Sequence, residues 1–197
     1  MDVDYSVELG AEDDALEFPW ASPEGELRYW DLKASPDLLL QIEEATRYRE
    51  LGEFLAAINS AGSMLLTAKC DAWFGDELQE AEEIYGASEK FCSYIDLLLE
   101  DSRGEQRFDF EEHENVARRL TELLKKAPEI SAAVEFIVRR CYYHSKAEAV
   151  RPGYYLTFYL SGYGDDDAEA RQSWGIGLRL VQNAIMQLSA EVRRAAE

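Results

Sequence analysis

Residues 64 to 74 alternate between two kinds of side chain over eleven positions. The even-numbered positions are apolar or small, and the odd-numbered positions end in Lys69, Asp71 and Trp73. A period of two sustained over this length indicates a strand with one buried face. The pattern therefore predicts a sheet, and it puts these last three side chains on the outward face of that sheet.

Two further stretches show the character of strands, although one of them, residues 91–99, also fits a helix because four of its nine residues are Leu or Ile. Residues 154–160 alternate as clearly as the first stretch, and residues 91–99 place their large apolar side chains mainly on one side. β-Branched and aromatic residues are common in both stretches, as is typical of strands. Together they add five residues to the predicted outward face: Tyr94, Asp96, Tyr155, Thr157 and Tyr159.

Residues 131–144 fit either a helix or a strand, because their apolar side chains satisfy both periods. We favour a strand, since a weak internal repeat aligns Cys141 with Cys70 and so places this stretch on a strand of the first half. If the alignment holds, three further side chains join the outward face: Arg140, Tyr142 and His144.

The internal repeat has a shift of 79 residues, from Gly25 to Gly104. It divides the chain into units 25–100 and 104–162, each with the order strand, helix, strand, strand. The opening strands would lie at 26–30 and 107–110. Few residues are identical between the two units, so a chance alignment stays open as the alternative.

Helix signals lie between the predicted strands. Ser35 and Pro36 are suited to begin one helix, and residues 51–58 continue the helical pattern. Asp109 is suited to cap another helix, which runs to about Lys126. The longest helix is predicted at 165–195, where Gly175 and Gly177 indicate that another part of the chain packs closely.

These elements predict an α+β fold, in which an antiparallel sheet of four or more strands carries helices mainly on one face. The long C-terminal helix closes the fold. Residues 25–197 form a single α+β domain in this interpretation, and residues 1–24 form an acidic N-terminal arm or hairpin. The first 26 residues hold nine acids and no Lys or Arg. The arm also holds three apolar side chains that could pack: Leu16, Phe18 and Trp20.

The chain is strongly acidic, with 40 Asp and Glu against 20 Lys and Arg and a net charge of -20. This charge repels nucleic-acid phosphates and anionic membrane surfaces, so we expect neither as a partner. No apolar run approaches the roughly 20 residues of a membrane span, and the N-terminus shows no signal peptide. Three cysteines, an odd and sparse set, favour a cytoplasmic protein without disulfides.

The outward face is the predicted site. Aromatic side chains beside charged ones are typical of a recognition surface. The alternative is that the N-terminal arm or a helix covers this face, so that its aromatic residues form a second layer of core. The predicted site residues are Lys69, Asp71, Trp73, Tyr94, Asp96, Arg140, Tyr142, His144, Tyr155 and Tyr159.

The sequence favours a non-enzymatic binding protein whose ligand is a protein or a small organic molecule. No cofactor or metal is expected, and a homodimer is compatible with the sequence. The alternative is a hydrolase or isomerase that uses Asp71, Asp96 and His144 as acid and base. The spacing of these three residues carries no catalytic signature. The enzyme hypothesis therefore requires that a carboxylate or His within a pocket has a perturbed pKa.

Overall fold

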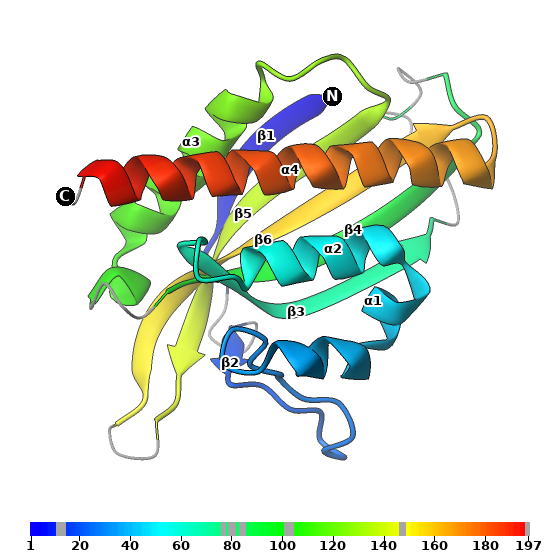
Figure 1. The fold of residues 1–197 in the computed structure, drawn as a ribbon. Coiled ribbons are helices and arrows are strands. Elements are labelled where there is room, and N and C mark those ends of the chain that lie inside the picture. Colours follow the sequence, from blue (N-terminus) through cyan, green and yellow to red (C-terminus); the bar gives the residue numbers. More distant parts are fainter. Residues whose placement is uncertain are drawn as a thin grey trace.

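A computed structural model describes residues 1–10, 15–75, 78, 82, 86–100, 105–145 and 149–195. The strands are β1 (Asp2–Glu8), β2 (Leu16–Phe18), β3 (Leu65–Phe74), β4 (Glu89–Leu99), β5 (Ala132–Tyr143) and β6 (Arg151–Gly164). The helices are α1 (Glu43–Arg47), α2 (Arg49–Ile58), α3 (Phe110–Leu124) and α4 (Asp167–Ala195), with 3-10 helices at Pro36–Gln41 and Glu105–Phe108. The fold is α+β, and α4 runs across one face of the sheet (Figure 1).

The sheet is mixed rather than antiparallel. Its strand order is β1-β5-β6-β4-β3, and β2 also pairs with β5. The central pairs are antiparallel as predicted, but β1 and β2 both run parallel to β5. A parallel pair requires a long connection, and here most of the chain lies between the paired strands. The N-terminal arm therefore contributes two strands to the sheet, which the prediction of an antiparallel sheet missed.

The four strands predicted from side-chain periodicity are confirmed. The stretches 64–74, 91–99, 131–144 and 154–160 correspond to β3, β4, β5 and β6. The predicted helices at 51–58 and 165–195 correspond to α2 and α4. Pro36 does begin a helix, but that helix is of the short 3-10 type.

The strands predicted to open each repeat unit do not form. Among residues 26–30, all of which the structure describes, only Arg28 forms a bridge, to Ala21. The second stretch is a 3-10 helix at Glu105–Phe108. The two halves still share the order helix, strand, strand, in α2-β3-β4 and α3-β5-β6. The duplication itself stays a prediction.

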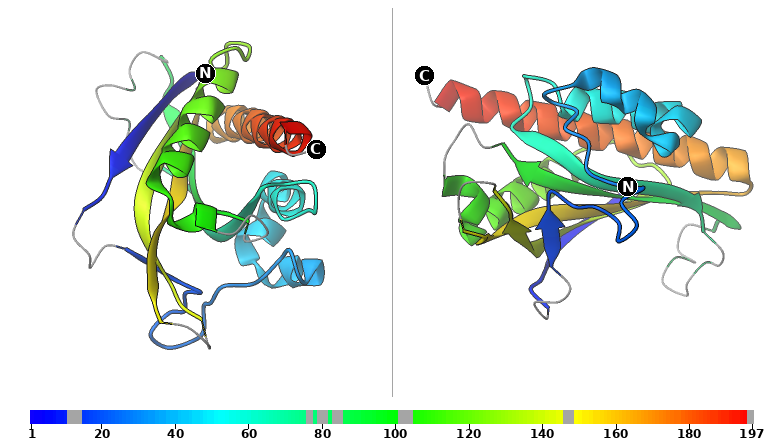
Figure 2. Two further views of the ribbon diagram at one scale, coloured as in Figure 1. Left: turned by 90° about the vertical axis from the view of Figure 1, so that its left-hand side faces the viewer. Right: turned by 90° about the horizontal axis from the view of Figure 1, so that it is seen from below.

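The core lies between the sheet and the helices on one face (Figure 2). Trp174 of α4 is fully buried there, and its ring centre lies 4.8 Å from that of Phe91. The indole nitrogen of Trp174 donates a hydrogen bond to Ser93 Oγ at 2.8 Å, which satisfies its polar group. The helices thus occupy one face, and the opposite face of the sheet is available for a site.

The close packing predicted at the two α4 glycines is confirmed. A Cβ atom at Gly175 would lie 3.2 Å from Glu50 Cγ, and one at Gly177 would lie 3.0 Å from Leu160 Cδ1. Gly177 therefore lets α4 approach the sheet, whereas Gly175 faces the flexible side chain of Glu50 on α2. These contacts fix the position of α4 across the sheet.

Asp109 caps α3, as the sequence predicts. Its carboxylate accepts a hydrogen bond from the Glu111 amide at 2.9 Å. We expect Asp109→Ala to lower the free energy of unfolding by about 1 kcal/mol, because one amide at the helix start loses its acceptor. Urea unfolding measures this change. Asp109→Ser preserves an acceptor and should recover most of the loss; equal losses in both variants would contradict the capping role.

Candidate functional site

A β-bulge in β3 determines which residues of this strand lie on the outward face of the sheet. The pairing of β3 with β4 shifts between Thr67 and Lys69, so Ala68 is an extra residue on β3. Such a residue reverses the alternation. Leu65 and Thr67 consequently face the helices, which corrects the prediction of unbroken alternation over 64–74. The residues beyond the bulge face outward as predicted: Lys69, Asp71 and Trp73.

The N-terminal arm covers one end of this outward face. A second apolar cluster lies there, formed by Leu66, Ala68, Leu98, Cys141, Tyr143 and Tyr155. Leu16 and Phe18 of β2 pack against it. The Trp20 indole donates a hydrogen bond to the Ala68 carbonyl at 2.6 Å. At this end, therefore, the aromatic residues do form a second layer of core, as the alternative interpretation held.

The other end of the outward face is open and carries three aromatic rings. Trp73 is 39% exposed and Tyr159 is 37% exposed. Tyr94 lies between them, with its ring centre 6.3 Å from that of Trp73 and 6.1 Å from that of Tyr159. These rings offer apolar surface beside charged groups, a combination typical of recognition surfaces.

A hollow of about 300 Å³ lies on this face, bordered by the arm. The arm supplies Ala15 and Leu16 as one wall. The strands supply six polar or charged residues: Lys69, Tyr94, Asp96, Arg139, Tyr155 and Tyr159. Five of these six belong to the predicted site, and Arg139 is the addition. We refer to this cavity and its eight lining residues as the hollow.

Asp96 of β4 is a buried carboxylate in the hollow, with only 5% of its surface exposed. Thr157 Oγ1 donates a hydrogen bond to Asp96 Oδ1 at 2.6 Å, and no other described group donates to this carboxylate. Burial raises the pKa of Asp96 to about 6, although the Thr157 bond and the charges of Lys69 and Arg139 oppose the change. Asp96 is thus a carboxyl group that can exchange a proton near neutral pH.

Lys69 lies beside Asp96 but forms no ion pair with it. The two residues are direct partners across β3 and β4, and their side chains share the outward face. The Lys69 ammonium instead lies over two rings, 5.4 Å from the centre of Trp20 and 5.9 Å from that of Tyr94. No described carboxylate lies within 4.0 Å of it. Lys69 therefore retains its hydrogen-bond donors for another group.

Arg139 of β5 contributes a second cation. Its guanidinium forms an ion pair with Glu8 of β1 at 2.7 Å, which anchors it at the edge of the sheet. Its Nη1 atom makes only long contacts, 3.4 Å to the Tyr159 hydroxyl and 3.5 Å to Thr157 Oγ1. One end of the guanidinium is thus held by Glu8 while the other is only weakly engaged.

Two tyrosines of the hollow, Tyr94 and Tyr155, keep their hydroxyl protons at neutral pH. Burial, and next the charge of Asp96, raises the pKa of Tyr155 to about 12. Burial likewise raises the pKa of Tyr94, with the charges of Asp96 and Asp71 acting in the same direction. Both residues can therefore donate hydrogen bonds to a molecule in the hollow.

Arg140 and Tyr142 do not lie on the outward face, which corrects their prediction. In the register of β5 with β6, Arg140 is paired with Tyr154 and Tyr142 with Pro152, and side chains at these positions face the helices. The repeat alignment assigned the wrong phase to β5. The alternation of Val134, Phe136 and Val138 within β5 itself predicts Arg139 as the outward residue, and this signal was available in the sequence.

His144 and Asp71 also lie apart from the buried carboxylate. His144 follows the end of β5, where its ring pairs with Glu17 of the arm. Asp71 does face outward, but it is exposed and its carboxylate accepts a hydrogen bond from the Ala72 amide at 2.7 Å. Neither residue lines the hollow. The structure therefore does not bring Asp71, Asp96 and His144 together as an acid–base group.

The cysteines offer no activated thiol. Burial raises the pKa of Cys70 and of Cys141 to about 12, and it also raises the pKa of Cys92. A nucleophilic thiol requires the opposite change in pKa. All three residues are consistent with small buried or half-buried apolar groups.

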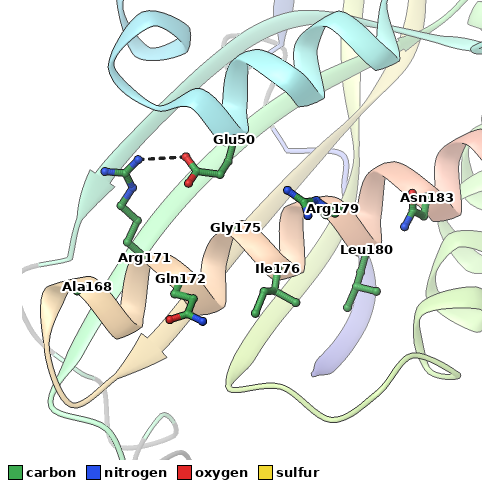
Figure 3. Close-up of a pocket in the computed structure, with 9 residues that line it drawn as sticks. All are labelled: Glu50, Ala168, Arg171, Gln172, Gly175, Ile176, Arg179, Leu180 and Asn183. Carbon is green, nitrogen blue, oxygen red and sulfur yellow. Dashed lines mark hydrogen bonds and ion pairs between the residues drawn. The ribbon is translucent and has the colours of Figure 1, made fainter.

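A larger groove of about 550 Å³ lies along α4, on the helix side of the molecule, and Glu50 is the residue that α2 contributes to its lining (Figure 3). Two of its charged groups already satisfy each other, because Arg171 and Glu50 form an ion pair at 3.1 Å. The groove also lacks a buried titratable residue among those that line it. The smaller hollow around Asp96 is therefore the stronger candidate for chemistry.

Comparisons with models of known protein families, with curated proteins and with solved structures find no match for this chain. None of the helices in the described ranges is long and apolar enough to cross a membrane. Among those same residues, no group of three or more His, Cys, Asp or Glu side chains is placed to hold a metal ion.

Proposed function

We propose that this chain is a non-enzymatic binding protein and that the hollow on the outward face is the site of a small organic ligand. The observation that carries the proposal is the pair formed by Lys69 and Asp96. These two opposite charges are neighbours across two strands, yet they do not neutralise each other by an ion pair. Both are directed into the same hollow.

The energetic cost of burying the Asp96 carboxylate supports this proposal. A buried carboxylate without a close cationic partner destabilises the fold, because it loses hydration that a single hydroxyl cannot replace. Asp96 keeps this unfavourable arrangement while a lysine lies next to it. Ionisable groups that destabilise the fold and face a cavity are concentrated in functional sites. A ligand that bonds to both charged groups would provide the hydrogen-bond partners that they lack in the folded protein.

An enzyme is the second candidate, and the raised pKa of Asp96 is the observation that favours it. A carboxyl group with a pKa of about 6 can act as a general acid or base near neutral pH. The neighbouring Lys69 could then hold an anionic intermediate. His144 has no place in this mechanism, because it lies at the end of β5 beside Glu17. Binding is the better supported function, since the described residues that line the hollow include no second carboxylate and no imidazole to pair with Asp96.

A thermal-shift screen of small organic compounds tests the binding function. We expect compounds that raise the melting temperature of the wild type to lose this effect in Lys69→Gln. The control is Arg140→Gln, which removes an exposed cation from the opposite side of the sheet. If every stabilising compound acts equally on wild type and on Lys69→Gln, the hollow is not the binding site.

A further inference from the structure

We propose that the ligand of the hollow is a small organic acid whose neighbouring carbon carries a hydrogen-bond donor, as in hydroxy acids and amino acids. This inference rests on the proposed binding function and specifies its chemistry. It is built from the positions of Lys69, Asp96, Arg139 and the aromatic rings on the outward face.

The cation for the acid group is Lys69. Its ammonium carries three donors and is held over the Trp20 and Tyr94 rings rather than by a described carboxylate. The Trp20 indole is itself fixed by its hydrogen bond to Ala68, so the arm keeps the ring under Lys69 in place. A carboxylate that enters the hollow gains a charge-assisted hydrogen bond without displacing an existing ion pair.

The acceptor for the neighbouring donor is Asp96. One of its oxygens accepts from Thr157, and the other has no hydrogen-bond donor among the described residues. Asp96 is the direct cross-strand partner of Lys69, so the two charged groups start from adjacent positions. A ligand that bonds to both therefore needs its anion and its donor close together. A donor on the carbon next to the carboxylate meets this requirement.

Arg139 and the rings determine the remaining features of the ligand. The weakly engaged Nη1 atom of Arg139 lies near Tyr159 and Thr157, and it can donate to the same carboxylate. Towards the open end, Tyr94, Tyr159 and Trp73 provide apolar surface for the rest of the molecule. An aromatic side chain suits this surface, since ring pairs at such distances attract each other.

Three matched compounds separate the contribution of the carboxylate from that of the neighbouring donor. They are compared at a pH of about 8, where Asp96 is ionised. 3-Phenyllactate carries the ring, the carboxylate and the hydroxyl group. 3-Phenylpropanoate lacks the hydroxyl group, and 3-phenylpropane-1,2-diol lacks the carboxylate. We expect NMR titrations of the wild type to give a Kd for 3-phenyllactate at least about tenfold lower than for either analogue, because each analogue loses one bond to a charged group.

Two variants test the assigned roles. Lys69→Gln should weaken the binding of 3-phenyllactate about tenfold and leave the binding of the diol unchanged. Asp96→Asn should reduce the preference for 3-phenyllactate over 3-phenylpropanoate without weakening the latter, because the acceptor charge is lost and no longer repels a carboxylate. Arg140→Gln should match the wild type with all three compounds.

The outcomes separate this inference from the function on which it rests. If 3-phenyllactate does not bind at millimolar concentration, or binds no better than its two analogues, the acid class is wrong. If the thermal-shift screen then finds another compound that depends on Lys69, the hollow is still a binding site. If no compound depends on Lys69, both the ligand class and the binding function are wrong.

Discussion

Replacing Asp96 by Asn should make the protein more stable at neutral and alkaline pH. The amide keeps an oxygen that can accept the Thr157 hydrogen bond, but it carries no charge to bury. The pKa of Asp96 rises from an ordinary value of 3.8 to about 6 on folding. Two pKa units correspond to about 3 kcal/mol, which is the expected gain in the free energy of unfolding at about pH 8.

The pH dependence of this gain has a definite sign. Between pH 3.8 and about 6 the folded protein holds a proton on Asp96 that the unfolded chain has released. The contribution of Asp96 to stability therefore falls as the pH rises through this window. Below the window Asp96 is neutral in both states, so wild type and Asp96→Asn should then have nearly equal stability.

Denaturant unfolding at about pH 8 and at about pH 3, which lies below this window, measures the difference. Asp71→Asn is the matched control, because Asp71 is an exposed carboxylate on the same face of the sheet. It should change stability little at either pH. A loss of stability in Asp96→Asn at about pH 8 would show that the ionised carboxylate stabilises the fold, and would remove the main support for a functional role.

Replacing Gly162 by Ala should strongly destabilise the protein. Gly162 lies on β6 directly beneath α4, where a Cβ atom would lie 2.1 Å from the Trp174 amide nitrogen and 2.5 Å from the Ala170 carbonyl oxygen. Both atoms belong to the helix backbone, so α4 itself must move to accept the methyl group. We expect a loss of at least about 3 kcal/mol, or roughly 10 °C in melting temperature.

Gly175→Ala is the matched control for this prediction. Gly175 lies on the same helix, but there the new Cβ atom would meet the flexible side chain of Glu50 at 3.2 Å. Alanine also has the higher helix propensity, so this variant should be as stable as the wild type or slightly more stable. Equal melting temperatures for Gly162→Ala and the wild type would contradict the close approach of α4 to β6.

The local periodicity of the sequence predicts most of the strands but not the pairing of the N-terminal arm. β3 and β6 were predicted because their alternation is long and concerns large side chains. β1 also alternates, with Val3, Tyr5 and Val7 facing the helices, but the acids between them suggested a solvated arm. Its partner β5 lies far along the chain, and parallel pairing leaves no local turn signal.

The candidate site is likewise predictable only where it depends on the alternation within a single strand. Tyr94, Asp96, Tyr155 and Tyr159 were placed correctly because β4 and β6 keep one phase throughout. Lys69 was placed correctly although the bulge at Ala68 reverses the phase before it. The adjacency of Lys69 and Asp96 depends on strand register, which no single strand reveals. The prediction lacks Arg139 because the weak repeat assigns β5 the opposite phase to the one that its own alternation indicates.

Mapping a bound compound by NMR tests the central claim most directly. A compound that stabilises the protein in the thermal-shift screen is titrated into labelled protein, and the shifted amide signals are assigned. We expect the largest changes around the hollow, at Lys69, Asp96 and Tyr159. Changes centred on the groove along α4, around Arg171 and Ile176, would place the binding site on the helix side and contradict the proposed function.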